Sequence, residues 1–284
     1  MNAIEASHIQ KTLGAFSIQD LSLTVPSGAI CGLVGENGAG KSTTIRLLMG
    51  ALRPDSGTAA VLGADPSSPA FQAVKEDIGV VLDEAYFPES LSAAQVGKIL
   101  SHTYRRWDQH HFDALLDRFS LPREKVFKDY SRGMRMKLAI AAAMSHAPKL
   151  LVLDEATAGL DPIARDEVLD LFNEFTREED HSILISSHIL SDLEKLCDYI
   201  AFLHQGTLLF CQEKDALLEQ YGLFQGAQED LDCLLPEAVV DQEANGYGGV
   251  RALVRTTLAP AGFQLERPTI EDIILFLVKG AKKQ

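Results

Sequence analysis

The chain has 284 residues, of which 46% are hydrophobic and 23% are charged, a composition typical of a globular protein rather than a disordered one. Forty acidic and 26 basic residues give a formal net charge of −14, which argues against a nucleic-acid binder that works by neutralising phosphates. The longest run without Asp, Glu, Lys or Arg spans residues 21–35 and contains Pro26. We therefore expect no membrane-spanning helix, which needs about 20 apolar residues.

The cysteines and the N-terminal segment bear on where the protein works. Cys31, Cys197, Cys211 and Cys233 are widely spaced and form no CxxC pair, so we interpret them as reduced thiols. The first ten residues have no basic stretch followed by an apolar core, so we predict no signal peptide. These features predict a soluble, cytoplasmic protein.

Up to about Cys211, short β-branched runs alternate with helical patterns, which predicts an α/β fold with helices on the faces of a sheet. A hairpin with Gly206 in the left-handed conformation is expected to join the last two of these strands. The expected buried strands cover residues 29–34, 78–82, 150–153, 182–186, 199–203 and 207–210.

Two segments depart from this alternation. Residues 84–148 read as mostly helical, which predicts an inserted helical subdomain. After residue 211 the chain becomes loop-rich, and residues 213–243 contain nine acids against one base. We therefore predict a main domain over residues 1–211 and a small α+β extension over 212–284.

Within the extension, some short sequence patterns indicate a definite secondary structure. The cluster NGYGG at residues 245–249 predicts a turn, followed by a strand over 250–254. Thr269, with Glu271 and Asp272 in the next turn, is a favourable N-cap for a helix that contains the apolar run 273–278.

The segment GENGAGKS at residues 35–42 fits the pattern GxxxxGK[ST], between a predicted strand and a helix predicted over 42–49. The glycines let consecutive backbone N–H groups converge on an oxyanion, and the helix N-terminus adds its positive dipole. Lys41 can then reach the β- and γ-phosphates, and the Ser42 hydroxyl can ligate Mg²⁺. The alternative, a glycine-rich turn that only caps a helix, is disfavoured by the flanking strand and helix. The predicted nucleotide-binding residues are Asn37, Gly38, Ala39, Gly40, Lys41, Ser42 and Thr43.

A second apolar strand ends in two carboxylates, Asp154 and Glu155. Ligands of doubly wound sheets bind at the carboxyl ends of the strands. Asp154 would therefore lie beside the phosphate loop and help to hold Mg²⁺, directly or through water. Glu155 would orient, and accept a proton from, a water that attacks the γ-phosphate. Taken alone, the pair is equally well explained as a strand end with two solvated acids.

Three further motifs accompany these two. YSRGM at residues 130–134 precedes the acidic strand, and AGLDP at 158–162 and SSH at 186–188 follow it. With the phosphate loop, this order resembles the ATPase subunit of ATP-binding cassette (ABC) transporters over nearly the whole chain. YSRGM corresponds to the LSGGQ signature of that family, which other P-loop enzymes lack. The resemblance implies a P-loop ATPase core with a mixed sheet, the inserted helical subdomain and a small C-terminal extension.

The resemblance also implies roles for individual residues. Two subunits would pack head to tail and enclose two ATP molecules. Ser131 and Gly133 would then serve the nucleotide of the second subunit, and Asp161 would contact the opposing phosphate loop. His188 would hydrogen-bond the γ-phosphate and the attacking water. The alternatives are that Ser131 is only an N-cap and that His188 is a structural strand-end histidine.

The chain departs from the family pattern at several positions. Asp83 stands where the family has a glutamine that reaches Mg²⁺, and its carboxylate can still face the ion. Leu13 occupies the usual position of the aromatic residue on which adenine stacks, and we favour Phe16 for that role. The signature contains Arg132 and Met134 in place of glycine and glutamine. This variant, with the C-terminal ending, resembles the ATPases of drug, antibiotic-peptide and lantibiotic exporters.

The implied function is Mg²⁺-dependent ATP hydrolysis that powers export through separate transmembrane permease subunits, with the chain on the inner face of the membrane. Residues 84–148 and the loop at Asp83 would form the groove that receives the permease, with contact at residues 86–88. The alternative for residues 86–88 is a packed loop with no partner. The dimer could be formed with a second copy or with another ABC ATPase. Two alternatives remain: a low-turnover regulatory cassette, and an ABC ATPase that acts on DNA or ribosomes. The single phosphate loop and the short spacing from Lys41 to Ser131 fit the second poorly.

Overall fold

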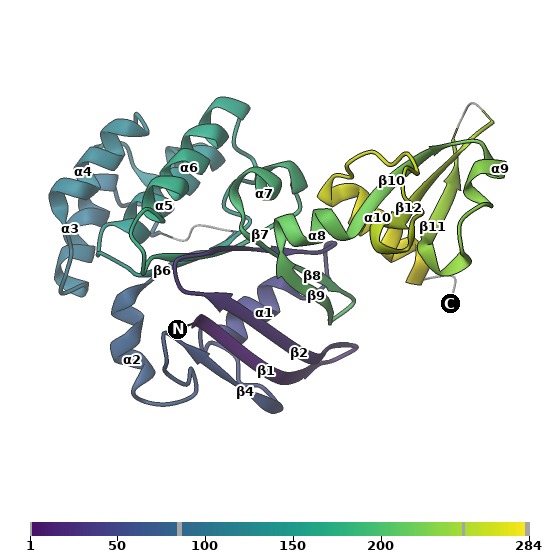
Figure 1. Cartoon of the computed structure of the whole chain (residues 1–284). Helices are drawn as coiled ribbons and strands as arrows, with labels where there is room; N and C mark the ends of the chain where they lie inside the picture. The colour runs from purple at the N-terminus through teal and green to yellow at the C-terminus, as the bar shows by residue number, and fades with distance from the viewer. Residues whose placement is uncertain (1, 84–86, 246–247, 282–284) are drawn as a thin grey trace.

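In the computed structural model, which describes residues 2–83, 87–245 and 248–281, a nine-stranded mixed sheet forms the larger part of the molecule (Figure 1). The central strands β3, β7, β6 and β5 are parallel, and β8 continues the parallel set beside β3. In spatial order the strands are β4 (Ser56–Val61), β1 (Asn2–Leu13), β2 (Phe16–Pro26), β9 (Thr207–Glu213), β8 (Tyr199–His204), β3 (Ile30–Val34), β7 (Ser182–Ser187), β6 (Leu150–Asp154) and β5 (Ile78–Val81).

Strands β3, β6 and β7 are largely apolar because both faces of the sheet are covered at these strands. In β6, Leu151 and Leu153 belong to one buried core, whereas Leu150 and Val152 belong to the other. Helix α1 (Lys41–Leu48) packs on the second core. Helices α5 (Arg132–Met144), α6 (Pro162–Phe175) and α7 (Leu190–Leu196) pack on the first. A strand buried on both sides reads as a continuous hydrophobic run.

The sequence-based predictions for this sheet are largely confirmed. All six expected strands are present within one to three residues of their predicted ends, and α1 begins one residue earlier than expected. Gly206 has a φ of 82° in the β8–β9 turn, as predicted. Strands β1, β2 and β4, which were not predicted from the sequence, pair antiparallel at one edge of the sheet. In β1 the alternation of buried and exposed residues is irregular, because β-bulges interrupt the strand around His8, whose φ is 52°.

Helices dominate the described residues between 87 and 148. Helix α3 (Ala93–Thr103) begins with a capping box at Ser92, and α4 (Gln109–Arg118) is capped by Asp108. With α5 they lie together at one end of the molecule (Figure 1), and the short α2 (Phe71–Val74) leads into β5.

The C-terminal residues form a second, three-stranded antiparallel sheet, which projects to one side (Figure 1). Its strands are β10 (Tyr221–Gly226), β12 (Val250–Arg255) and β11 (Val239–Ala244), and its helices are α8 (Lys214–Gln220), α9 (Gln228–Leu231) and α10 (Ile270–Ala281). The strand predicted at 250–254 is confirmed, and so is the N-cap Thr269, whose hydroxyl accepts the Asp272 N–H at 3.1 Å. The predicted turn at 245–249 includes residues 246 and 247, which lie outside the described part of the chain.

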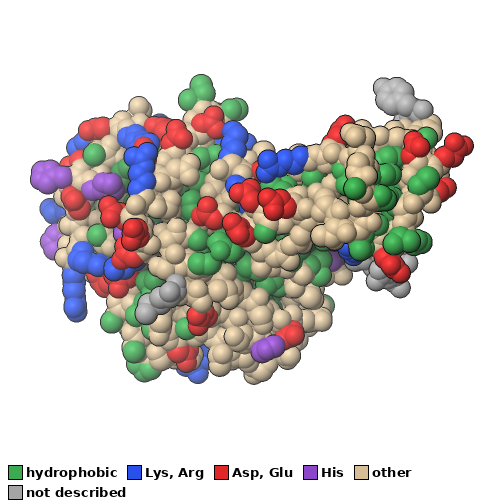
Figure 2. All heavy atoms as spheres, viewed as in Figure 1, with side chains coloured by type: hydrophobic (Ala, Val, Ile, Leu, Met, Phe, Trp, Pro, Cys, Tyr) green, Lys and Arg blue, Asp and Glu red, His purple; other side chains and the backbone are tan. Residues whose placement is uncertain are grey.

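One face of this small sheet packs in the apolar core of the main body through Leu223 and Leu253, whereas its other face has a separate core that includes Phe224 and Val254. Ile270, Ile273 and Phe276 of α10 are fully buried in the same cluster as Leu193 and Leu196 of α7. On the face shown in Figure 2, acidic side chains gather at the far end of the extension, whereas acidic and basic side chains are interspersed over the helical part. Part of the negative charge is thus located far from the phosphate loop.

Candidate nucleotide site

The phosphate loop connects β3 to α1, and its backbone requires glycine. Gly38 and Gly40 have φ angles of 83° and 113°, which side chains disfavour. A Cβ on Gly40 would also lie 2.6 Å from Cδ1 of Ile18 and 2.9 Å from Cζ of Phe16. Lys41 is buried, and its Nζ donates a hydrogen bond to the Gly35 carbonyl at 2.8 Å. The loop therefore holds its amine inward at the N-terminus of α1.

The end of β6 places two carboxylates next to this loop. Asp154 is buried at the last position of the strand, and Glu155 follows with a φ of 54°. This left-handed conformation is uncommon for a residue other than glycine and is found repeatedly at functional sites. The turn points the Glu155 side chain back toward the phosphate loop.

Glu155 contacts two of the other predicted residues. Its Oε1 lies 3.4 Å from Nζ of Lys41, and its Oε2 lies 2.6 Å from Nδ1 of His188, which donates to the carboxylate. The Glu155 side chain is only 13% exposed, whereas His188 is 53% exposed. Three side chains from the ends of three neighbouring strands thus meet at one point.

A cavity of about 540 Å³ opens over this point. It is lined by most of the predicted site residues, namely Phe16, Asn37, Gly38, Gly40, Lys41, Ser42, Thr43, Asp83, Glu155 and His188, together with Glu36, Arg132 and Ala158. Ala39 and Asp154 are buried beneath this surface. Leu13 is exposed and does not belong to the lining, so Phe16 is the aromatic side chain at the cavity.

Arg132 and Ala158 were not among the predicted site residues. The Arg132 guanidinium lies 3.3 Å from Asp83 and crosses over Gly159, where a Cβ would lie 3.1 Å from Cδ of Arg132. The sequence signal for Arg132 was its unusual presence in the signature segment. Its side chain links the helical part of the molecule to the end of β5.

Three predicted residues lie outside this cavity. Ser131 is the N-cap of α5 and accepts the Met134 N–H at 3.3 Å, and Gly133 follows in the first turn. Asp161 is the N-cap of α6, where hydrogen bonds from the backbone N–H groups of Ala164 and Ile163 lower its pKa. Ser131 and Asp161 thus cap helices within one chain, and none of the three residues lines the cavity at the phosphate loop.

The donor set of the cavity is oxygen-rich. Within the part of the chain that is described, no three His, Cys, Asp or Glu side chains cluster as a metal site. Ser42 and Asp83 nevertheless line the cavity, and Asp154 lies directly below it. A hydroxyl and carboxylates beside a phosphate loop match the preference of Mg²⁺ for oxygen ligands completed by phosphates and water. The residues present therefore fit a magnesium–nucleotide complex.

A parallel central sheet that ends in a phosphate loop, a buried aspartate and a Glu–His pair defines a P-loop nucleoside-triphosphatase. Within the described residues, no helix is both long enough and apolar enough to cross a membrane. Residues 18–158 match the sequence profile of the family described as ABC transporter.

Individual relatives agree with this match. The chain is 36% identical to the bacitracin transport ATP-binding protein BcrA of Bacillus licheniformis, over 72% of this chain and 68% of the relative. It is 31% identical to the daunorubicin/doxorubicin resistance ATP-binding protein DrrA of Streptomyces peucetius, over 97% of this chain and 92% of the relative. A solved ATP-binding subunit of an ABC transporter has a TM-score of 0.70 at 26% identity, and the match covers 77% of this chain and 92% of that one.

The chain therefore belongs to the ABC transporter family, as one of its ATP-binding subunits. Members of this family bind and hydrolyse ATP. The predicted resemblance to the ATPases of drug and antibiotic-peptide exporters is confirmed by these relatives.

Proposed function

We propose that this chain hydrolyses ATP in a Mg²⁺-dependent reaction and that hydrolysis powers export through separate permease subunits in the membrane. The observation that carries the proposal is the meeting of Lys41, Glu155 and His188 in one cavity with the phosphate loop. An ammonium, a carboxylate and an imidazole are the groups needed to bind phosphate, activate water and hold it in place.

Each side chain has a separate role in this proposal. Lys41 leaves Glu155 and binds the β- and γ-phosphates, which frees the carboxylate to orient a water and accept its proton. His188 hydrogen-bonds the γ-phosphate and that water, and Phe16 stacks on adenine. Ser42, Asp154 and Asp83 would hold Mg²⁺, which would neutralise charge on the phosphates.

The residues outside the cavity fit a site shared between two subunits. Ser131 and Gly133 present a helix N-terminus, which attracts anions. Asp161 is exposed, and Ile163, two residues further on, is 83% exposed despite its apolar side chain. We therefore assign this surface to a second ABC ATPase subunit, identical or different, whose nucleotide it would contact.

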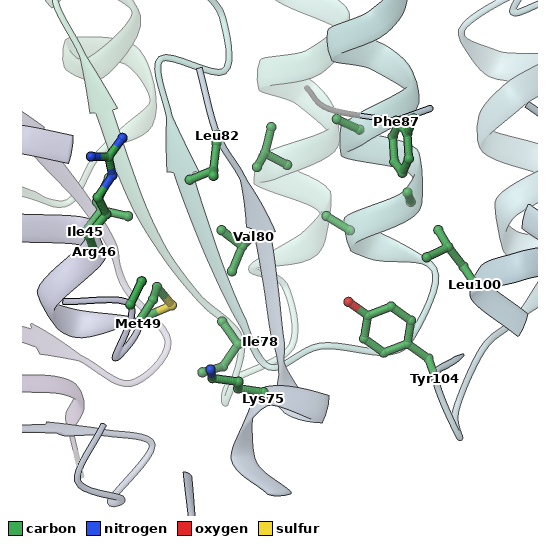
Figure 3. A pocket seen from close by; sticks show the side chains of 15 residues that line it. Ile45, Arg46, Met49, Lys75, Ile78, Val80, Leu82, Phe87, Leu100 and Tyr104 are labelled. Atoms are coloured by element: carbon green, nitrogen blue, oxygen red, sulfur yellow. The ribbon is translucent and has the colours of Figure 1, made fainter. Parts of the chain in front are cut away.

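An apolar groove supports the assignment of a membrane partner. A cavity of about 510 Å³ lies between α1, the edge strand β5 and the helices of the helical part (Figure 3). Val80 and Leu82 are 40% and 43% exposed in it, and Phe87 packs edge-on against Phe127 at its far side. A cytoplasmic segment of a permease would cover these side chains. Of the predicted contact at 86–88, residue 86 lies outside the described part.

These assignments also give the chain a domain organisation. Residues 1–211 would form the nucleotide-binding domain, with residues 84–148 as the helical subdomain that carries the signature and receives the permease. Residues 212–284 would form the extension. Such a subunit works on the cytoplasmic side, bound peripherally to the inner face of the membrane through its permease.

The proposal is tested with the variant Glu155→Gln. We expect it to lose ATPase activity by a factor of about 10²–10⁴, because the general base is removed while the shape of the side chain is retained. Light scattering should show that Mg²⁺-ATP converts this variant from monomer to dimer. Glu178→Gln, at an exposed site away from the cavity, is the control. Wild-type turnover in Glu155→Gln would refute the role of Glu155, and a monomer that binds no ATP would favour a regulatory cassette.

A further inference from the structure

Ser186 occupies a position from which its hydroxyl contacts both residues of the acidic strand end. It lies in β7 directly opposite Asp154 of β6 in the parallel register, and it is fully buried. Its Oγ donates a hydrogen bond to Oδ1 of Asp154 at 2.5 Å. The Asp154 carboxylate is therefore held by one of its two oxygens from the neighbouring strand.

The same hydroxyl also acts on Glu155. The backbone N–H of Glu155 donates to Oγ of Ser186 at 3.1 Å and to the Ser186 carbonyl at the same distance. Glu155 is the residue with a φ of 54°, a conformation that persists only where the surroundings hold it. One serine thus fixes the orientation of the first carboxylate and the backbone from which the second projects.

Ser187, the next residue in β7, makes different hydrogen bonds. Ser187 is equally buried, but its hydroxyl accepts the Ile189 N–H at 3.0 Å at the start of α7. The two serines are adjacent in sequence, are similar in burial and each accept one backbone hydrogen bond. Only Ser186 also bonds to a carboxylate of the site.

We propose that Ser186 is a positioning residue for magnesium binding and water activation, acting through Asp154 and Glu155. This inference rests on the roles given to those two residues in the proposed function. By donating to one oxygen of Asp154, the hydroxyl fixes the rotation of the carboxylate toward the phosphate loop. By accepting the Glu155 N–H, it keeps the general base aimed at the cavity. Partners that orient metal-binding carboxylates change metal affinity or activity by about 10–100-fold when they are removed.

The test compares Ser186→Ala, Ser186→Thr and Ser187→Ala in the full-length chain. Calorimetry measures the affinity for a non-hydrolysable ATP analogue with and without Mg²⁺, and the ratio of the two affinities isolates the contribution of the metal. We expect Ser186→Ala to lower this ratio about tenfold, with little change in the affinity measured without metal. Ser186→Thr keeps the hydroxyl and should restore the ratio, and Ser187→Ala should retain it. Turnover at saturating Mg²⁺-ATP should fall in Ser186→Ala, since Glu155 is also misplaced.

Thermal unfolding of all three variants separates positioning from folding. Ser186→Ala loses two side-chain hydrogen bonds and Ser187→Ala loses one, so a purely structural role predicts a somewhat larger loss of stability in Ser186→Ala but similar Mg²⁺ ratios in the two variants. Equal ratios in these two variants would overturn the inference, whether both remain at the wild-type value or both fall. A wild-type chain whose affinity does not respond to Mg²⁺ would refute the proposed metal site itself, and this inference with it.

Discussion

Oδ1 of Asp83 lies 3.3 Å from Nη2 of Arg132, so two positions at which this chain departs from the usual motifs of its family form an ion pair with each other. Both side chains are more than half exposed, and such pairs contribute only about 0.2–1 kcal/mol to the free energy of unfolding. The effect of the pair is therefore expected at the cavity that both residues line rather than in the stability of the fold.

Removing the charge of Arg132 and removing the charge of Asp83 should change the affinity for ATP in opposite directions. Arg132→Ala leaves a carboxylate facing the phosphates, so ATP affinity without Mg²⁺ should fall. Asp83→Asn leaves a guanidinium there, so affinity should rise. Each change should be about two- to tenfold at low salt and should shrink as salt screens the charges. Titration of ATP at two ionic strengths measures both effects, with the exposed Lys98→Ala as a control, and shifts of the same sign would contradict the prediction.

Gly97 should not tolerate alanine, although it lies inside helix α3. A Cβ there would lie 2.6 Å from Cε1 of Phe112, whose ring is fully buried. Alanine in an open helix position stabilises by about 1 kcal/mol relative to glycine. Overpacking a buried ring costs about 1–3 kcal/mol, so we expect net destabilisation by Gly97→Ala. Urea unfolding measures it, and the exposed Ser101→Ala in the same helix should change little. A stabilised Gly97→Ala would show that Phe112 can move.

His146 should make the fold sensitive to mild acid. Burial lowers the pKa of His146, which is stacked on Tyr104 at 4.1 Å, although a hydrogen bond to the Ile78 carbonyl acts in the opposite direction. The unfolded chain binds a proton at a histidine pKa of about 6.5, whereas the folded chain resists it, so stability decreases as the pH falls below that value.

Unfolding by urea at about pH 7.5 and about pH 5.5 tests this expectation. His146→Gln should lose less stability between the two pH values than the wild type, because Gln binds no proton. His110→Gln, at an exposed site, is the matched control and should follow the wild type. Parallel pH profiles for wild type and His146→Gln would contradict the assignment.

Phe276 should be critical for the extension because it is fully buried in the core shared with α7. Phe276→Ala is expected to cost about 3–5 kcal/mol. Leu275→Ala in the same helix is the control, since that side chain is 38% exposed and should cost much less. Urea unfolding of both variants provides the comparison. Equal losses would mean that the shared core does not depend on α10.

Because α10 packs on α7, removing the whole extension should also destabilise the main domain. Truncation after Gln212 would expose Leu193 and Leu196 of α7, which the extension now covers. We therefore expect the truncated chain to aggregate and to unfold at a lower temperature. Point variants on the surface of the extension are therefore a better way than truncation to test what the extension does.

The parallel strands and the phosphate loop could be predicted because their signals are local. Continuous apolar runs and a fixed glycine spacing identify them without knowledge of the rest of the chain. Strand β1 could not be found in this way, since bulges shift its alternation so that no single face stays apolar.

Only some of the contacts within the site could be predicted from the sequence. Glu155 and His188 could be proposed as site residues from the order of motifs. No residue pattern, however, predicts the left-handed backbone at Glu155. The pairing of Asp83 with Arg132 joins residues 49 positions apart, and neither alone predicts the other. Ser186 could have been noticed because it lies opposite Asp154 once the strands are paired, but that register comes from the fold.

Helix α7 begins two residues after His188, and its buried side packs on α10. A small rotation of α7 about its first turn would carry α10 and the three-stranded sheet with it. Displacement grows with distance from a pivot, and the extension projects well away from this one (Figure 1). For any such rotation, the tip of the extension would thus travel further than His188, so the extension would enlarge a small change at the cavity edge.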